Sequence, residues 1–311
     1  MKKILITGGA GYIGSKLSTE LINNGFKVTV IDRLDYSQNS INHLIYHKNF
    51  NLIIKDVRDK KFIKFLIKKN DIIIPLAGLV GAPLCEKNQK EAKETNYECI
   101  KHIVNNIGNK KIIYLNTNSG YGIGEKNIYC DENSELKPIS LYGVTKCQSE
   151  KEVVKLNNYV CFRLATVFGY SYRMRTDLLV NNFTYRLFKE KKLSIFEPHF
   201  RRNFININDV VRGIIYSIEN FSKMKGNIFN LGLSNANLTK IQLAKKIKKI
   251  LKNGSKIMQI KNRKDPDKRD YFVSNKKIEK KGFKATISLD KGISELIQIF
   301  TNDKNKVINN Y

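Results

Sequence analysis

The chain has 311 residues and a mass of 35.9 kDa, enough for one large domain or two modest ones to bury a core. Hydrophobic residues make up 41% and charged residues 27%, which is a globular composition and excludes a disordered chain. The formal net charge is +28, but 45 of the 56 basic residues are Lys scattered along the whole chain, which is typical of a solvated surface and argues against nucleic acid as a partner.

The first half of the sequence alternates short β-branched runs with longer amphipathic segments. The expected strands are Lys3–Thr7, Lys27–Ile31, Asn51–Lys55, Asp71–Ile74, Lys111–Leu115 and Tyr159–Arg163. Helical patterns lie between them at Ile13–Asn23, Lys60–Ile67, Gln89–Ile107 and Tyr142–Leu156. Because strands and helices alternate in this way, the sequence predicts the α/β class, with a parallel sheet covered by helices on both faces.

The pattern changes after Arg163. A polar and aromatic stretch, Phe168–Asn206, is followed by a helix-like segment at Asp209–Glu219 and a strand-like segment at Asn227–Leu231 that resemble a return to the sheet. Two amphipathic helices are expected in the tail, at Lys240–Leu251 and Leu289–Phe300, with a charged loop between them. We therefore expect a second lobe built from discontinuous segments.

Membrane spans, disulfides and metals are not expected. The longest nearly apolar stretch, Ile72–Cys85, has 14 residues and is interrupted by Pro75 and Pro83, so no membrane helix is predicted. The five cysteines are odd in number and show no Cys-x-x-Cys spacing, which favours a reducing cytoplasm. The four histidines show no metal-ligand spacing, so no metal is assigned.

A glycine-rich turn directly follows the first strand. Small residues there let the backbone turn sharply and approach a pyrophosphate, whose charge the next helix N-terminus stabilises. Asp32, at the end of the second strand, is placed to accept hydrogen bonds from an adenosine ribose and would repel a 2′-phosphate, so NAD is favoured over NADP. The neighbouring Arg33 argues the other way. The turn residues expected to contact the cofactor are Gly8, Gly11, Tyr12, Ile13 and Gly14.

Tyr142 and Lys146 form a Tyr-x-x-x-Lys pair at the start of a predicted helix. Residues four apart share one helical face, so the ammonium can lie beside the phenol and the cofactor ribose. We expect this positive neighbour to lower the pKa of Tyr142 from about 10 towards neutrality, as a general base requires. Thr117, which ends the fifth strand, carries a hydroxyl that can bind the same substrate oxygen. The candidate catalytic residues are Thr117, Tyr142 and Lys146.

In this order along the chain, the motifs resemble those of the extended short-chain dehydrogenase/reductases that act on nucleotide sugars. The resemblance runs nearly end to end and implies a Rossmann-type doubly wound parallel sheet with a smaller C-terminal substrate-binding lobe. It implies an NAD-binding domain over residues 1–165, rejoined by 204–231, and a nucleotide-sugar lobe formed by 166–203 and 232–311. It also implies a homodimer that pairs through the helices Gln89–Ile107 and Tyr142–Leu156.

The same resemblance implies roles for residues outside the catalytic trio. The expected cofactor contacts after the third and fourth strands and in the following helix are Asp56, Val57, Leu76, Ala77, Gly78 and Asn96. Arg202 and Arg269 match the two late arginines that grip the nucleotide diphosphate in this family, and a guanidinium fork fits phosphate oxygens.

Several segments resemble more narrowly a subgroup that acts on GDP-heptoses in bacterial surface-polysaccharide synthesis. They are Leu79–Cys85, Asn116–Lys126, Arg163–Gly169, Arg173–Asn181, His199–Asn203 and Asp265–Tyr271. From these segments we expect the substrate to contact Val80, Gly81, Asn118, Ser119, Arg175 and Asn181.

The related 4,6-dehydratases carry Asp-Glu directly after the catalytic Thr, where this chain has Asn118 and Ser119. The decarboxylating branch also has a Glu at the second of these positions. Neither residue can act as a carboxylic acid, so dehydration and decarboxylation lose support. We therefore expect NAD-dependent oxidation at C4 of a nucleotide sugar to a 4-keto sugar, with C4 epimerisation by the same residues as the alternative. An NAD-sensing regulator would not need Thr117, Tyr142 and Lys146 together.

Overall fold

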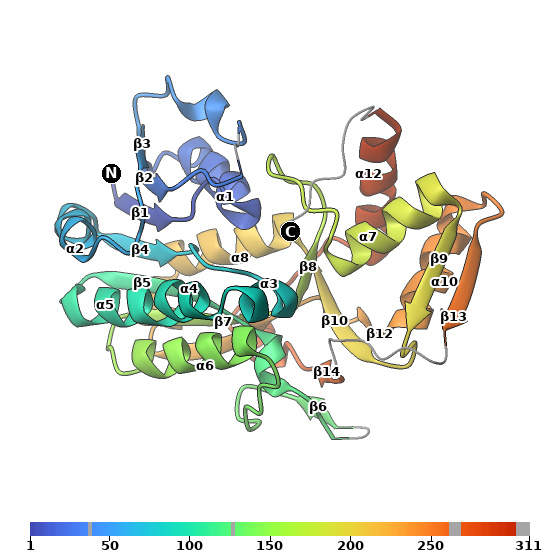
Figure 1. Cartoon of the computed structure of the whole chain (residues 1–311). Helices are drawn as coiled ribbons and strands as arrows, with labels where there is room; N and C mark the ends of the chain where they lie inside the picture. Colours follow the sequence, from blue (N-terminus) through green and yellow to red (C-terminus); the bar gives the residue numbers. More distant parts are fainter. Residues whose placement is uncertain (37–38, 126–127, 261–268, 303–311) are drawn as a thin grey trace.

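The computed structural model describes residues 1–36, 39–125, 128–260 and 269–302, arranged in two lobes (Figure 1). The first lobe is built on a seven-stranded sheet in which every pair of neighbouring strands is parallel. In spatial order its strands are β11 (Asn227–Leu231), β7 (Tyr159–Leu164), β5 (Lys111–Thr117), β4 (Ile72–Pro75), β1 (Lys3–Thr7), β2 (Lys27–Asp32) and β3 (Phe50–Ile54). The predicted α/β class and doubly wound parallel sheet are confirmed.

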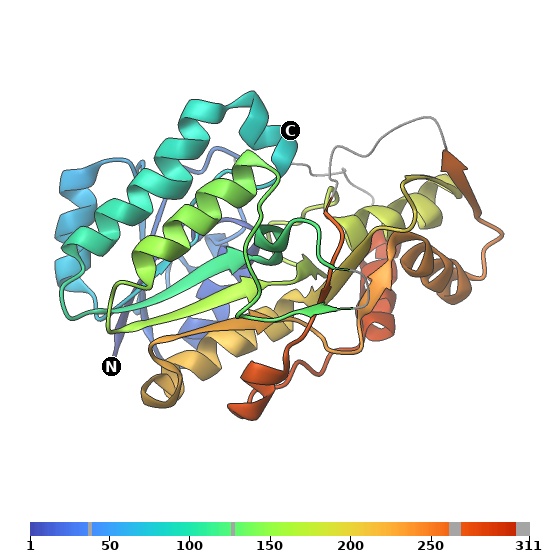
Figure 2. The same ribbon diagram turned by 90° about the horizontal axis from the view of Figure 1, so that it is seen from below.

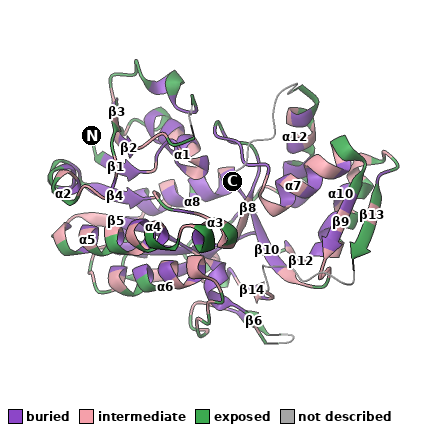
Figure 3. Cartoon of the chain, viewed as in Figure 1, coloured by how far each residue is buried: buried purple, intermediate pink, exposed green. Residues whose placement is uncertain are grey.

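Helices cover both faces of this sheet. One face is covered by α1 (Tyr12–Asn23) and α8 (Ile207–Glu219), and the other by α2 (Lys60–Lys69), α5 (Cys99–Asn106) and α6 (Leu141–Val153). Figure 2 shows α5 and α6 side by side across their face. The side chains of β1 alternate accordingly: Ile4 and Ile6 belong to the core under α1 and α8, and Leu5 belongs to the core under α2 and α5. The central strands are therefore buried on both sides (Figure 3).

The predicted helix Gln89–Ile107 is interrupted. It consists of α4 (Gln89–Lys93), a π-helical turn at Glu94–Glu98 and α5. The turn contains Asn96, which is 3% exposed and faces the loop after β4. Such π-turns inside helices are frequent at functional sites. A short helix, α3 (Ala82–Lys87), precedes this segment and was not anticipated.

The second lobe gathers segments that are far apart in sequence. Its sheets pair β10 (Arg201–Asn206) with β8 (Thr166–Phe168) and β12 (Asn237–Thr239), and β9 (Lys192–Phe196) with β13 (Lys256–Ile260). Its helices are α7 (Leu179–Tyr185), which runs into a π-turn at Arg186–Glu190, α10 (Lys240–Leu251) and α12 (Leu289–Asn302). A short helix, α11 (Lys276–Lys280), packs against β11 at the edge of the seven-stranded sheet. A small pair, β6 (Tyr129–Cys130) and β14 (Phe272–Val273), lies below the sheet lobe. Short helical turns at Asn42–Leu44, Asn118–Tyr121 and Phe221–Met224 (α9) complete the elements.

One predicted boundary falls within a strand of the small three-stranded sheet. Residues 204–231 were expected to rejoin the first lobe, and α8 and β11 do so. Residues 204–206, however, belong to β10 and pair in parallel with residues 166–168 of β8 in the small three-stranded sheet. Two of the segments matched to the GDP-heptose subgroup extend past the described residues: position 126 of Asn116–Lys126 and positions 265–268 of Asp265–Tyr271 lie outside them.

The two lobes are joined by the start of α1. The Tyr12 hydroxyl donates to the carbonyl oxygen of Gly169 at 2.8 Å, and the Ser171 hydroxyl donates to the carbonyl oxygen of Tyr12 at 2.6 Å. Ser15 and Ser171 share a further hydrogen bond of 3.0 Å. The larger hydrophobic core also runs without a break from the α1 and α8 face of the sheet to α12. No helix of the described residues is long and apolar enough to span a membrane.

A buried ion pair connects α6 to the sheet. Arg163 on β7 donates to both carboxylate oxygens of Glu150 on α6, at 2.7 and 3.1 Å, and each side chain is 5% exposed. Asn116 on β5 donates to the same carboxylate at 2.6 Å. Arg163 also donates to the Tyr121 hydroxyl at 3.1 Å, so one ion pair joins α6, β5, β7 and the turn that follows β5.

We predict that Arg163→Ala lowers the free energy of unfolding by about 3–5 kcal/mol, because it leaves the Glu150 carboxylate buried without its counter-ion. Urea unfolding followed by circular dichroism measures this loss. Lys137→Ala, in an exposed ion pair with Glu135, is the control and should leave the unfolding midpoint unchanged. Equal stability of the two variants would contradict the account.

Candidate active site

A cavity of about 510 Å³ lies at the carboxyl ends of β1, β4 and β5 and extends to residues of the second lobe. Open parallel sheets bind ligands at this edge, where the strand order reverses between β1 and β4. Most residues predicted for the site line this one cavity. They are Gly8, Gly11, Tyr12, Ile13, Gly14, Leu76, Ala77, Gly78, Val80, Gly81, Asn96, Thr117, Ser119, Tyr142, Lys146, Arg175, Arg202 and Arg269.

The glycine turn approaches its neighbours too closely for side chains. Gly8 has φ +72°, and a Cβ there would lie 2.5 Å from the backbone nitrogen of Ala77. A Cβ on Gly14 would lie 2.3 Å from the carbonyl oxygen of Gly8. Helix α1 then begins at Tyr12 with no acidic residue in its first turn. The positive end of its dipole is therefore available to a pyrophosphate, so the turn fits a dinucleotide.

The Asp32 carboxylate hydrogen-bonds to the backbone of the glycine-rich turn and of the loop after β2. One carboxylate oxygen accepts from the backbone N–H of Ala10 at 3.0 Å, and the other accepts from that of Leu34 at 2.9 Å. Burial raises its pKa, and the two backbone hydrogen bonds act in the opposite direction. Asp32 does not line the cavity, so its contact with a ribose stays a prediction.

Arg33 is engaged by carboxylates. Its guanidinium forms ion pairs with Asp35, with Asp56 at 3.2 Å and with Glu91 at 2.7 Å. Although burial alone would raise the pKa of Asp56, hydrogen bonds from Arg58 and Arg33 lower it to about 2. The Asp56 carboxylate is thus already paired.

Neither Asp56 nor Val57 lines the cavity; Val57 packs into the core under α2 and α5. Their contact with adenine therefore stays a prediction.

The loop after β4 is fixed by Asn96. Its amide oxygen accepts from the N–H of Leu79 at 2.8 Å, and its amide nitrogen donates to the carbonyl oxygen of the same residue at 2.9 Å. A Cβ on Gly78 would lie 2.7 Å from that amide oxygen. Ser149 on α6 donates to the backbone carbonyl of Asn96 at 2.6 Å, which ties this loop to the helix that carries Tyr142 and Lys146.

The catalytic candidates come from two neighbouring elements. Thr117 is the last residue of β5. Helix α6 begins after Ser140, whose hydroxyl caps it by accepting from the N–H of Gly143 at 3.2 Å, and this start places Tyr142 and Lys146 one turn apart at the cavity. The Lys146 ammonium lies 4.2 Å from the centre of the Tyr114 ring.

The expected direction of the Tyr142 pKa shift is wrong for this structure. Burial raises the pKa of Tyr142 to about 12, and the cations that oppose the rise are Arg269 and Arg175. Burial also lowers the pKa of Lys146 to about 8, so its charge is itself costly. The second lobe, rather than Lys146, therefore brings the opposing positive charge towards the phenol.

The residues predicted to contact the substrate make different contacts within the protein. Arg175 forms a buried ion pair with Asp177, and Arg202 donates to the backbone carbonyls of Arg201 and Arg269. Asn181 does not line the cavity; it accepts from the N–H of Gly169 at 3.0 Å and so positions the loop that carries Arg175.

Asn118 does not line the cavity either. It is 1% exposed, and neither polar atom of its amide has a hydrogen-bond partner.

Other cavity residues were not predicted from the sequence. They include Tyr36, Arg173, Asp177 and Lys240. Arg173 lies 4.5 Å from the Tyr36 ring, so the loop after β2 meets the loop after β8. Arg173 and Asp177 lie in the matched segment Arg173–Asn181 but were not singled out there, and Tyr36 and Lys240 lie in no motif and reach the site only by folding.

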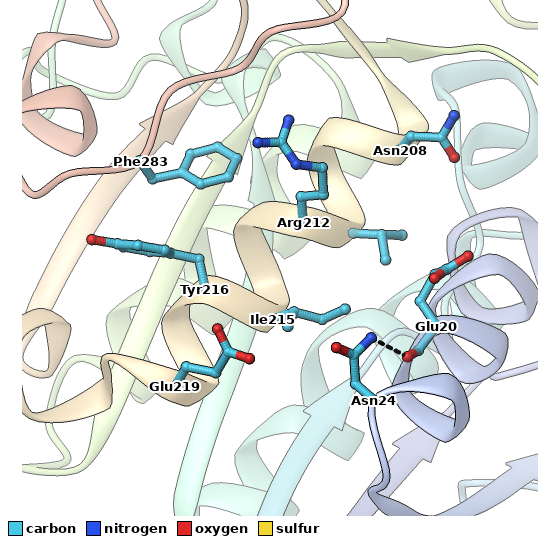
Figure 4. Close-up of a pocket in the computed structure, with 9 residues that line it drawn as sticks. Glu20, Asn24, Asn208, Arg212, Ile215, Tyr216, Glu219 and Phe283 are labelled. Atoms are coloured by element: carbon cyan, nitrogen blue, oxygen red, sulfur yellow. Dashed lines mark hydrogen bonds between the residues drawn. The ribbon is translucent and has the colours of Figure 1, made fainter.

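A second hollow lies away from these residues, between α1 and α8 (Figure 4). Its charged members are Glu20, Arg212 and Glu219. Arg212 is held by the buried Asp209 and by the Thr286 hydroxyl, so it serves the packing of the segment before α12. No predicted site residue lines this hollow.

Comparison with known proteins agrees with this geometry. Residues 4–232 match the NAD dependent epimerase/dehydratase family. The chain belongs to this family. It is therefore an extended short-chain dehydrogenase/reductase enzyme, and its cofactor is NAD, as the sequence predicted.

A similar curated protein is the ADP-L-glycero-D-manno-heptose-6-epimerase of Brachyspira hyodysenteriae, 29% identical over 81% of this chain and 82% of its own length. Among solved structures, the UDP-glucose 4-epimerase of Thermotoga maritima has a TM-score of 0.82 at 24% identity and covers 96% of this chain and 98% of its own. The dTDP-glucose 4,6-dehydratase of Bacillus anthracis with NAD has a TM-score of 0.84 at 18% identity and covers 98% of each chain. Among the described residues, no group of three or more His, Cys, Asp or Glu could hold a metal ion.

We predict that Tyr142→Phe keeps the fold and NAD binding but lowers turnover by about 10²–10⁴-fold, the loss typical of a general base. Near wild-type rates in the variant would remove Tyr142 from the mechanism.

Because the pKa of Tyr142 is raised and the phenolate is the active form, wild-type kcat/KM for oxidation should rise with pH from about 6 to 8. A wild-type rate that falls over this range would contradict the phenolate.

We predict that NAD binds more tightly than NADP, because the Asp32 carboxylate at the end of β2 would repel a 2′-phosphate and Arg33 is paired with three carboxylates. Calorimetric titration of the wild type and of Arg33→Ala measures this preference. The variant should keep it. Equal or tighter binding of NADP to the wild type would mean that Arg33 leaves its carboxylates for the 2′-phosphate.

Proposed function

We propose that this enzyme oxidises C4 of a nucleotide-linked sugar, with a GDP-heptose as the substrate, and releases a 4-keto sugar for bacterial surface-polysaccharide synthesis. The observation that carries the proposal is the chemistry of the cavity beside Thr117, Tyr142 and Lys146. Among the described cavity residues, Asp177 alone is a carboxylate, and it is ion-paired with Arg175. Elimination of water needs an acid at this end of the site, whereas oxidation of an alcohol needs only a base and a hydride acceptor.

Each residue has a defined task in this reaction. Bound NAD supplies the hydride acceptor. Tyr142, as phenolate, takes the proton of the C4 hydroxyl, and Thr117 donates a hydrogen bond to the same oxygen. Lys146, whose pKa is lowered to about 8 by burial, would hold the cofactor ribose. Asn96 holds the loop after β4, so that Gly78 and Val80 stay at the edge of the cavity.

A nucleotide diphosphate suits the cationic second-lobe side of the cavity. Arg173, Arg175, Arg202, Lys240 and Arg269 line it, and guanidinium groups bind phosphate oxygens with two parallel hydrogen bonds. The name of the Brachyspira relative contains a nucleotide-linked heptose, which supports a heptose as the sugar. The GDP base rests on the sequence segments around Val80, Ser119 and Arg175.

C4 epimerisation is the second candidate, because the Thermotoga structure of the same fold is a 4-epimerase. Both reactions begin with the same oxidation by Thr117, Tyr142 and Lys146. An epimerase must then turn the keto sugar and return the hydride, so NAD is regenerated in every cycle. A dehydrogenase releases the keto sugar and retains NADH.

A cytoplasmic homodimer that pairs through Gln89–Ile107 and Tyr142–Leu156 is part of the proposal. The exposed faces of these two segments include Lys93, Lys101, Lys151 and Lys155. A dimer that pairs these faces must place anions or opposite charges between them, so it should weaken at low ionic strength.

We predict that the purified enzyme, given a GDP-heptose and no second hydride acceptor, makes about one 4-keto sugar per bound NAD and then stops as the NADH form. Absorbance at the NADH band and mass spectrometry of the sugar measure both products. ADP-, UDP- and dTDP-linked sugars are the matched controls. Sustained turnover to a C4 epimer would favour the alternative, and product from another nucleotide sugar alone would correct the substrate.

A further inference from the structure

The Ser119 hydroxyl lies between the catalytic candidate Thr117 and an arginine of the second lobe. Its Oγ is 2.9 Å from Thr117 Oγ1 and accepts a hydrogen bond from Nη1 of Arg269. Its backbone N–H also donates to Thr117 Oγ1, at 3.1 Å. These contacts join residues that are 150 positions apart in sequence.

The directions of these hydrogen bonds follow from the groups involved. A guanidinium can only donate, so Ser119 Oγ accepts from Arg269. Ser119 is 1% exposed, and its buried hydroxyl proton requires an acceptor, which Thr117 Oγ1 supplies. Thr117 Oγ1 then accepts from both the hydroxyl and the backbone N–H of Ser119, which fills its two lone pairs. The proton of Thr117 is left to point into the cavity.

The position of Arg269 is fixed by its neighbour. The Asp270 carboxylate accepts from the backbone N–H of Arg201 at 2.7 Å and from its Nε at 2.8 Å. The backbone of Asp270 pairs with the loop after the Asn118–Tyr121 turn, donating to Gly122 at 3.1 Å and accepting from Gly124 at 2.8 Å. Arg202 also donates to the carbonyl oxygen of Arg269. These hydrogen bonds of Asp270 and Arg202 connect the two lobes and place the Arg269 guanidinium beside Ser119.

We propose that Arg269 and Ser119 act as positioning residues that hold Thr117 as a pure hydrogen-bond donor to the C4 oxygen of the sugar. The inference rests on the C4 oxidation proposed above. A Thr117 hydroxyl that could also accept would offer the C4 hydroxyl a second, unproductive acceptor for its proton. With Thr117 fixed as a donor, the C4 hydroxyl can donate only to the Tyr142 phenolate, which is the direction that oxidation requires. The same donor then holds the carbonyl oxygen of the 4-keto product.

The test is a double-mutant cycle on Thr117 and Ser119, with single-turnover NADH formation and nucleotide-sugar affinity measured separately. Ser119→Ala should slow NADH formation by about 10-fold, less than the roughly 10²–10³-fold loss of a donor that touches the reacting oxygen. Its affinity for the nucleotide sugar should be unchanged. Thr117→Ala should be slower still, and Thr117→Ala/Ser119→Ala should lie within about twofold of it, because Ser119 acts only through Thr117.

Ser119→Cys keeps nearly the same size and a weak donor and should restore part of the rate. This result distinguishes the relay, meaning the hydrogen bonds from Arg269 to Ser119 and from Ser119 to Thr117, from lost packing. Ser234→Ala, at an exposed hydroxyl that binds Glu279, is the control and should match the wild type. Multiplicative losses in the cycle, or a Ser119→Ala that loses affinity but not rate, would overturn the relay and leave Ser119 as a substrate contact. A wild type that forms no NADH from any nucleotide sugar would overturn the proposed function and the relay with it.

Discussion

The buried ion pair between Glu150 and Arg163 is the interaction on which the candidate site depends. Glu150 lies one turn after Lys146 on α6, and Arg163 lies on β7. Through Asn116 the same carboxylate reaches β5 one residue before Thr117, and through Tyr121 the guanidinium reaches the end of the turn that contains Ser119. The hydroxyl of Thr117 and the phenol of Tyr142 therefore hold their relative positions because one desolvated carboxylate is shared by the two elements that carry them. A pair buried this deeply stabilises little by itself, but leaving either charge unpaired is costly, which makes its geometry rigid.

The candidate site takes its residues from both lobes. The sheet edge supplies the glycine turn, Thr117, Tyr142 and Lys146, and the second lobe supplies the arginines. Burial raises the pKa of Tyr142 and so disfavours the phenolate at neutral pH, and the positive charges that oppose this come from Arg269 and Arg175. Hydrogen bonds from Tyr12 and Ser171 tie the lobes together beside the glycine turn. The candidate cofactor and substrate sites are therefore parts of one connected structure.

Local features were predictable from the sequence, and long-range ones were not. All six predicted strands of the first half, and the glycine turn, follow from periodicity and glycine spacing within a few residues, because buried parallel strands are continuous apolar runs. The strands of Phe168–Asn206 carry no such signal: β9 pairs with β13 and β10 with β12, partners that lie far along the chain. The carboxylates around Arg33 and the Ser119–Arg269 contact also arise only on folding. The pKa of Tyr142 shifted against expectation because spacing along a helix shows proximity but not desolvation.

In the proposed reaction, Tyr142 and Thr117 direct the C4 hydrogen of a nucleotide sugar to NAD as hydride, and the keto sugar then leaves. The most direct measurement is proton and deuterium NMR after one turnover with substrate deuterated at C4. We expect one deuteron on the nicotinamide ring of the cofactor per active site and a 4-keto sugar that carries none. Deuterium returned to C4 of an epimerised sugar, or deuterium that never leaves C4, would contradict it.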